Sequence, residues 1–309
     1  MADQRPFRFG IQQYQATSAA EWREKARRAE ALGYDILVNA DHIGQGGLTF
    51  APALMAVADA TTTLRIGTLV LDNDFRHPAL VAADSATLDL LSDGRFELGI
   101  GAGWDRMDYD VSGIPFDAPK VRVDRLAESV GIIKRLLGGE LVTFNGKQYA
   151  IHDLTNYPPP VQQPHPPILI GGGGPRMLSI AAREADIVSI MPAGVATGTM
   201  PDLRATSMTR GVGRVREAAG ERFGELELNT LLQRLVVTDD TRSAAEDLAN
   251  QWNMTIEDAL DSPWALMGTI DHIVDVLQAR RNRFGMSYWI VHDRLMEAFA
   301  PVVDRLAGI

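Results

Sequence analysis

The segment "FRFGIQQYQATS", residues 7–18, decides the fold class of this chain. Residues 7–13 form an apolar, β-prone run that predicts the first strand. In an open doubly wound sheet, the first strand is followed by a glycine cluster that binds a dinucleotide. No glycine follows residue 10 in this segment. The segment therefore favours a closed barrel over the open sheet.

Seven further strands are predicted along the chain, alternating with helical patterns. Strands are expected over residues 34–39, 64–71, 95–101, 166–171, 186–191, within 225–237, and over 285–291. Helices are expected over residues 18–33, 77–91, 121–137, 175–184 and 270–283. This spacing implies parallel strands with right-handed crossovers. Eight such units predict an α/β fold, a (β/α)8 TIM barrel that occupies residues 1–309 as a single domain.

Several connections are longer than a bare barrel requires, and we expect them to form loop insertions at the C-terminal face. They cover residues 104–120, 138–165, 192–210 and 238–268. Within them, "FNGKQY" (144–149) predicts a small hairpin that turns at Asn145–Gly146. The proline-rich stretch 157–167 predicts an extended lead-in to the fifth strand. Barrel chemistry lies at the C-terminal strand ends, so these loops are expected to build the rim of an active site.

The composition excludes several classes of function. The 309 residues include no cysteine, which excludes disulfides and thiolate metal sites. A formal net charge of −10 argues against a general nucleic-acid or anionic-membrane binder. No run approaches the length of apolar sequence that a membrane span needs, and the first residues show no signal-peptide core. We expect a cytoplasmic protein that acts on a small molecule.

Asp41 and His42 follow the second predicted strand and are the best catalytic candidates. Histidine exchanges protons near neutral pH, and a strand end of a barrel is where such a group acts. A loop histidine beside a helix cap explains the same position without catalysis. No His-x-x-x-His pair is present, so we expect no metal site.

The run "ILIGGGGPRM", residues 168–177, places four glycines between a strand and a helix. It matches neither the P-loop nor the Gly-x-Gly-x-x-Gly fingerprint. Bare backbone N–H groups at a helix start suit a phosphate, and Arg176 would add positive charge. Close packing of the strand against its helix is the alternative explanation.

Four segments together resemble the luciferase-like flavin and deazaflavin oxidoreductase family, and within it the actinobacterial branch that uses coenzyme F420. They are "EALGYDILVNADH" (30–42), "LRIGTLVLDNDFRHPALVAADSATLDLLSDGRFELGIGAGW" (64–104), "PPPVQQPHPPILIGGGG" (158–174) and "AAREADIVSI" (181–190).

The resemblance implies that the tricyclic ring of the cofactor lies at the C-terminal end of the barrel. Asp41 and His42 would lie near the ring, and Thr68, Leu69 and Val70 would back it, with a non-proline cis peptide at Leu69–Val70. The amides of Gly172, Gly173 and Gly174 would bind the cofactor phosphate. The expected cofactor contacts also include Gly103, Met107, Arg176 and Ser189. A homodimer is expected as well.

Two departures from the sugar-phosphate dehydrogenases of this family bear on the substrate. Trp104 stands where those enzymes carry a glutamate, and residues 191–198 lack their lysine. We therefore expect a substrate other than a sugar phosphate. The side chains of Tyr14, Trp104, Met107 and Met191 favour an apolar, aromatic or lipid-like one.

These observations predict an F420-dependent oxidoreductase that transfers a hydride between the deazaflavin C5 and a small organic substrate. His42 would be the general acid or base, Asp41 would support it, and Trp104 would wall the substrate side. The alternative is an FMN-dependent luciferase-like monooxygenase that uses reduced flavin and oxygen. A non-catalytic flavin-binding barrel is a third hypothesis, and it predicts cofactor binding without turnover.

Overall fold

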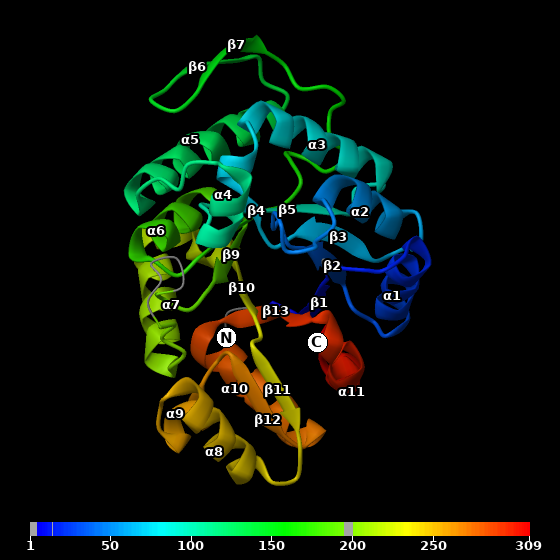
Figure 1. The fold of residues 1–309 in the computed structure, drawn as a ribbon, viewed down its shortest axis with the longest axis vertical. Coiled ribbons are helices and arrows are strands. Elements are labelled where there is room, and N and C mark those ends of the chain that lie inside the picture. The colour runs from blue at the N-terminus through cyan, green and yellow to red at the C-terminus, as the bar shows by residue number, and fades with distance from the viewer. Residues whose placement is uncertain (1–4, 14, 195–199) are drawn as a thin grey trace.

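The computed structural model describes residues 5–13, 15–194 and 200–309, and its central feature is a closed ring of eight parallel strands (Figure 1). Pairing of β1 with β13 and of β3 with β5 completes the ring. All eight predicted strands are present, so the predicted TIM barrel is confirmed. In order around the ring the strands are β1 (Arg8–Gln12), β2 (Ile36–Asn39), β3 (Arg65–Thr68), β5 (Phe96–Gly101), β8 (Ile168–Gly172), β9 (Ile187–Ile190), β10 (Glu227–Leu231) and β13 (Met286–His292).

Helices cover the outside of the ring, and the five predicted ones are confirmed. The first begins as predicted, because the Ser18 hydroxyl accepts a hydrogen bond from the Glu21 amide at 3.1 Å. The predicted helices are α1 (Ala19–Ala31), α3 (Pro78–Leu91), α5 (Pro119–Leu137), α6 (Pro175–Glu184) and α10 (Ile270–Phe284). Six further helices in the described residues were not predicted: three lie within the expected insertions and are described below, and the others are α2 (Phe50–Ala58), α7 (Ala205–Ala219) and α11 (Met296–Leu306). Short 3₁₀ turns are η1 (Asn73–Phe75), η3 (Gly220–Glu225) and η4 (Asp293–Leu295).

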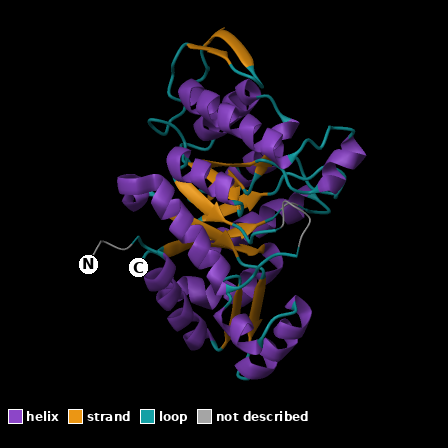
Figure 2. Cartoon of the chain, turned by 90° about the vertical axis from the view of Figure 1, so that its left-hand side faces the viewer, coloured by secondary structure: helices purple, strands orange, loops and turns teal. Residues whose placement is uncertain are grey.

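The insertions lie around the barrel as separate small units. The predicted hairpin is confirmed as β6 (Val142–Asn145) and β7 (Ala150–Leu154). It lies at the opposite end of the molecule from a unit built of β11, α8, α9 and β12 (Figures 1 and 2). The elements of that unit are β11 (Arg234–Val237), α8 (Thr241–Trp252), α9 (Ile256–Asp261) and β12 (Ala265–Gly268). A further short helix, α4 (Arg106–Ser112), follows β5 at the carboxyl end of the strands. No helix in the described ranges is long and apolar enough to cross a membrane.

A buried ion network fills the amino end of the barrel. Glu97 accepts hydrogen bonds from Arg8 at 2.5 Å and from Arg65 at 2.7 Å, and Arg8 also contacts Glu227 at 2.7 Å. Each of these residues lies at or next to the first position of its strand. Burial opposes the ionised form of Glu97, but Arg8 and Arg65 outweigh it and hold the pKa of Glu97 below its usual value.

An apolar layer lies above the ion network inside the barrel. Half-buried Val70 and Met191 pack against this layer. Among the described residues, charged side chains thus occupy the amino end of the barrel and apolar side chains its interior, so we expect a ligand at the carboxyl end. The layer consists of Ile36, Val38, Leu69, Leu169, Ile187, Leu231, Tyr288 and Ile290.

Removing the charge of Glu97 is expected to destabilise the protein strongly. Glu97→Gln leaves two arginines without their shared counter-charge, and breaking a buried ion pair in this way costs about 3–5 kcal/mol. Urea unfolding measures the effect, with Glu24→Gln as the control because Glu24 is exposed and paired only with Arg27 on the same helix. A loss below about 1 kcal/mol for Glu97→Gln would contradict a stabilising role of the network.

Candidate active site

The candidate site lies at the carboxyl ends of the strands. Its floor is formed where the pairing of β3 with β5 is interrupted, a place called the seam below. Their pairing stops after Gly67, and the Thr68 hydroxyl then bridges both backbone groups of Gly99, donating to its oxygen at 2.7 Å and accepting from its nitrogen at 2.9 Å. The predicted cis peptide at Leu69–Val70 is present next to it. Pairing resumes at the short strand β4 (Leu71–Asp72). Thr68 is thus a structural bridge, while half-buried Val70 lies at the edge of the apolar layer.

Asp41 forms an ion pair with Arg76. Its carboxylate accepts two hydrogen bonds from Arg76, at 2.5 and 3.0 Å, and a third from the Asp72 amide at 3.1 Å. A bidentate pair of this kind fixes a side chain in place. The contacts tie the loop after β2 to the segment after β4, so Asp41 serves the site by positioning.

His42 is clamped by an acidic residue that sequence reasoning missed. Its Nδ1 lies 2.7 Å from Oδ2 of Asp108 in α4, and Asp108 is buried. The Trp104 ring meets the imidazole edge to face, with the ring centres 5.8 Å apart. The structure therefore brings two predicted catalytic residues, His42 and Trp104, into contact. Trp104 remains 48% exposed, which leaves an aromatic surface at the mouth of the site.

His42, Asp105 and Asp108 are close enough together to offer three ligands to a cation. The Gln45 amide nitrogen already donates to both carboxylates, at 2.8 Å to Asp105 and 3.1 Å to Asp108. Asp105 also caps α4 by accepting from the Met107 amide at 3.0 Å. The cluster is satisfied by protein donors, and we assign no metal ion to it.

The neighbouring side chains require a glycine at position 103. The cofactor contact predicted for Gly103 stays a prediction. It has a positive φ of 75°, and a Cβ on it would lie 1.9 Å from the Tyr109 hydroxyl. That hydroxyl donates to Asp72 at 2.7 Å. Burial raises the pKa of Asp72 to about 7, although the hydrogen bonds from Tyr109 and from the Asp74 amide act in the opposite direction.

The four glycines of residues 171–174 differ in their surroundings, and none of them has a positive φ. A Cβ on Gly172 would crowd Met177, and a Cβ on Gly173 would lie 2.5 Å from the Met191 carbonyl oxygen. Gly174, the N-cap of α6, has no atom of the described residues within 4 Å of a Cβ position. Packing therefore requires glycine at positions 172 and 173, while the described residues leave space beside Gly174; the predicted phosphate contacts of the three amides stay predictions.

The remaining predicted residues are spread around the site. Arg176 forms an ion pair with Asp124 of α5, so its charge is already partnered. Ser189 is fully buried in β9, and Met107 is 59% exposed on α4. Tyr14 lies outside the residues that the structure describes.

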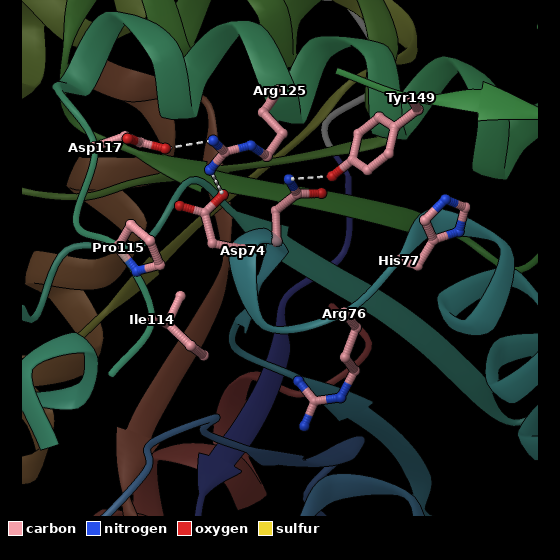
Figure 3. A pocket seen from close by; sticks show the side chains of 9 residues that line it. Asp74, Arg76, His77, Ile114, Pro115, Asp117, Arg125 and Tyr149 are labelled. Atoms are coloured by element: carbon pink, nitrogen blue, oxygen red, sulfur yellow. Dashed lines mark hydrogen bonds and ion pairs between the residues drawn. The ribbon is translucent and has the colours of Figure 1, made fainter. Parts of the chain in front are cut away.

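A pocket of about 310 Å³, lined by charged, polar and apolar residues, borders Arg76, the partner of Asp41 (Figure 3). Arg125 lies between two aspartates and pairs with both Asp74 and Asp117. The buried Asn73 side chain donates to the Tyr149 hydroxyl at 3.2 Å, while its Oδ1 has no hydrogen-bond partner among the described residues. The lining residues are Asn73, Asp74, Arg76, His77, Ile114, Pro115, Asp117, Arg125 and Tyr149.

The luciferase-like monooxygenase family model matches residues 5–302. Among curated proteins, the F420-dependent glucose-6-phosphate dehydrogenase of Nakamurella multipartita is 34% identical over 258 residues, covering 80% of this chain and 72% of that protein. Further enzymes of the same name are matched over about half of their own length. The chain therefore belongs to the luciferase-like monooxygenase family.

Solved structures agree on the fold. The coenzyme F420 dependent tetrahydromethanopterin reductase from Methanopyrus kandleri superposes with a TM-score of 0.79 at 18% identity, covering 97% of this chain and 99% of that one. The monooxygenase RslO1 from Streptomyces bottropensis gives 0.72 at 23% identity, covering 95% and 97%. Identities this low establish the barrel and leave the choice of cofactor to the site and to the curated relatives.

Replacing Asp72 is expected to change how stability depends on pH. Because its folded pKa is raised from 3.8 to about 7, the folded protein keeps a proton that the unfolded chain loses. Asp72 therefore lowers the free energy of unfolding progressively as the pH rises through this range. Asp72→Asn removes the titration, so the variant should gain roughly 2–4 kcal/mol relative to wild type between about pH 4.5 and about pH 8.

Urea unfolding at the two pH values measures this gain, with the exposed Asp304→Asn as the control. If Asp72→Asn and wild type lose stability in parallel, Asp72 does not titrate across this range.

Proposed function

We propose that this chain is an F420-dependent oxidoreductase that moves a hydride between C5 of the deazaflavin and a small organic substrate that carries no phosphate. The observation that carries the proposal is the contact of His42 with Trp104 at the carboxyl end of the barrel, opposite the end that the ion network occupies. Family membership and the F420-dependent relatives support the choice of cofactor.

The residues present fit this cofactor. Half-buried Val70 and Met191, at the edge of the apolar layer, offer a surface on which a tricyclic ring can lie. At the start of α6, no side chain of the described residues caps the helix, so its first N–H groups are open to an anion beside Gly174. A helix start of this kind favours a phosphate through its bare N–H groups and its dipole.

When bound, the deazaflavin would accept or donate a hydride at C5. The protein supplies the rest of the chemistry. His42 holds or accepts the proton that accompanies the hydride. Asp41, fixed by Arg76, keeps the loop that carries His42 in place. Trp104, with its half-exposed ring, walls the substrate side.

The charges around the site support a substrate without a phosphate. Arg76 is paired with Asp41, and Arg125 is paired with Asp74 and Asp117, so neither arginine is left to neutralise a phosphate. The unpartnered Oδ1 of Asn73 would instead accept a hydrogen bond from a hydroxyl or N–H group. The Nakamurella relative is named for glucose 6-phosphate, which makes that compound the first substrate to compare.

An FMN-dependent monooxygenase is the second candidate, favoured by the fold it shares with RslO1. The two functions differ in their use of oxygen, because hydride transfer to a substrate needs none. The homodimer expected from the sequence stays a prediction, which sedimentation equilibrium of the pure protein tests.

Cofactor titrations separate the two candidates. F420 is expected to quench the protein fluorescence with a Kd at least about tenfold below that of FMN, a difference of about 1.4 kcal/mol. Turnover with F420 should proceed without oxygen uptake in an oxygen electrode. Tight FMN binding together with no F420 binding would overturn the proposal.

The space beside Gly174 gives a second test. Gly174→Val fills it and is expected to weaken F420 binding at least about tenfold, while the changed N-cap costs about 1 kcal/mol of stability. Gly224→Val is the matched control, because a Cβ on Gly224 also meets no atom within 4 Å. An unchanged F420 affinity in folded Gly174→Val would show that the phosphate binds elsewhere.

A further inference from the structure

We infer that Asp108 is a positioning residue for His42, fixing the imidazole so that Nδ1 carries the proton and Nε2 is the nitrogen that exchanges one. The inference rests on the proposed function for its kinetic consequence only. The protonation state of the His42 imidazole follows from the hydrogen bonds around Asp108, and nitrogen NMR measures it without any turnover.

Asp108 is surrounded by hydrogen-bond donors. Its Oδ1 accepts from the Ile43 amide at 3.0 Å and from the Gln45 side-chain nitrogen at 3.1 Å. Gln45 is oriented by a second carboxylate, because the same nitrogen donates to Asp105 at 2.8 Å. A carboxylate that receives these donors acts as an acceptor toward its next neighbour as well.

That next neighbour is Nδ1 of His42, 2.7 Å from the other oxygen of Asp108. The Gln45 side-chain nitrogen also lies 3.4 Å from Nδ1, but it is closer to Asp105 and Asp108, to which it donates. An ionised carboxylate can only accept, so the short contact with Asp108 assigns the proton to Nδ1. In the neutral ring, Nε2 then carries the lone pair. When Nε2 takes a proton, the buried carboxylate stabilises the positive charge that forms on the imidazole.

Helix α4 makes the arrangement rigid. It begins at its cap Asp105 and ends at Gly113, which has the left-handed conformation that closes many helices. Asp108 lies in the first turn of this helix, and Trp104 directly precedes the cap residue Asp105. One short element therefore both holds the imidazole through Asp108 and packs Trp104 against it.

In the proposed reaction, the hydride and the proton that leave the substrate each have an acceptor. With F420 bound, a substrate alcohol would lose the hydride of its C–H bond to C5 of the cofactor and the proton of its O–H bond to Nε2 of His42, which would leave a carbonyl. The reverse reaction returns both. Asp108 and Asp105 both bring a carboxylate oxygen close to a ring nitrogen of His42, while the neighbouring Asp41 is bound to Arg76.

Nitrogen NMR of the protein without cofactor tests the protonation state. The chain has six histidines, and ¹⁵N-labelled His42 is identified by the signal that His42→Gln removes. In wild type at about pH 8, above the usual histidine pKa, the spectrum should show Nδ1 protonated and Nε2 bare. In Asp108→Asn this preference should be lost. A wild-type ring protonated at Nε2, or a ring unchanged by Asp108→Asn, would overturn the inference.

Steady-state kinetics test whether the positioning of His42 by Asp108 affects turnover. Asp108→Asn should lower kcat, by up to roughly 10²–10⁴-fold, with a much smaller change in KM. Asp110→Asn is the matched control, since Asp110 lies on the same helix but is exposed and pairs only with Arg106. A full kcat in folded Asp108→Asn rejects the positioning role. Absence of F420 turnover in wild type would reject the proposed function instead, and the NMR result would still decide the state of His42.

Discussion

The seam between β3 and β5 is the constraint on which the barrel mouth depends. The ring can close only if Thr68 approaches Gly99 so closely that a Cβ there would lie 1.8 Å from the Thr68 carbonyl oxygen. The Thr68 hydroxyl replaces the missing ladder bonds. The chain then leaves the regular strand at Leu69–Val70, and this departure gives the site its floor.

The same departure places the polar groups of the site. Directly after the seam, the Asp72 amide and the Arg76 guanidinium both reach Asp41 and fix the loop that carries His42. From the other side, α4 reaches His42 through Asp108. Two segments that follow neighbouring strands thus hold the loop that carries His42. At the opposite end of the barrel, Glu97 pairs with Arg8 and Arg65.

Local sequence patterns predicted the barrel well because strands and amphipathic helices leave periodic signals. Helix α2 was missed for a physical reason: "FAPALMAVA" has no polar face and contains a proline, so no amphipathic period marks it. The site was harder to predict. Asp41 and His42 were identified by their place after a strand, but Asp108 lies 66 residues from His42 and only the fold brings them together.

Two expectations show how packing changes the meaning of a motif. The predicted phosphate contacts of Gly172 and Gly173 stay predictions, but packing gives a second reason for glycine at both positions, because a Cβ there would collide with its neighbours. The contact predicted for Arg176 also stays a prediction, and its guanidinium already pairs with Asp124. Partners distant in sequence decide whether a charge is available, and no local pattern reveals them.

The central claim is that the carboxyl end of the barrel holds F420 with its ring against Val70 and beside His42. A crystal structure of the protein soaked with F420 tests this claim most directly. The account predicts electron density for the tricyclic ring between Val70 and the His42–Trp104 pair, with the phosphate beside Gly174. Ring density at any other place on the molecule, or FMN density at this site from a mixture of both cofactors, would contradict it.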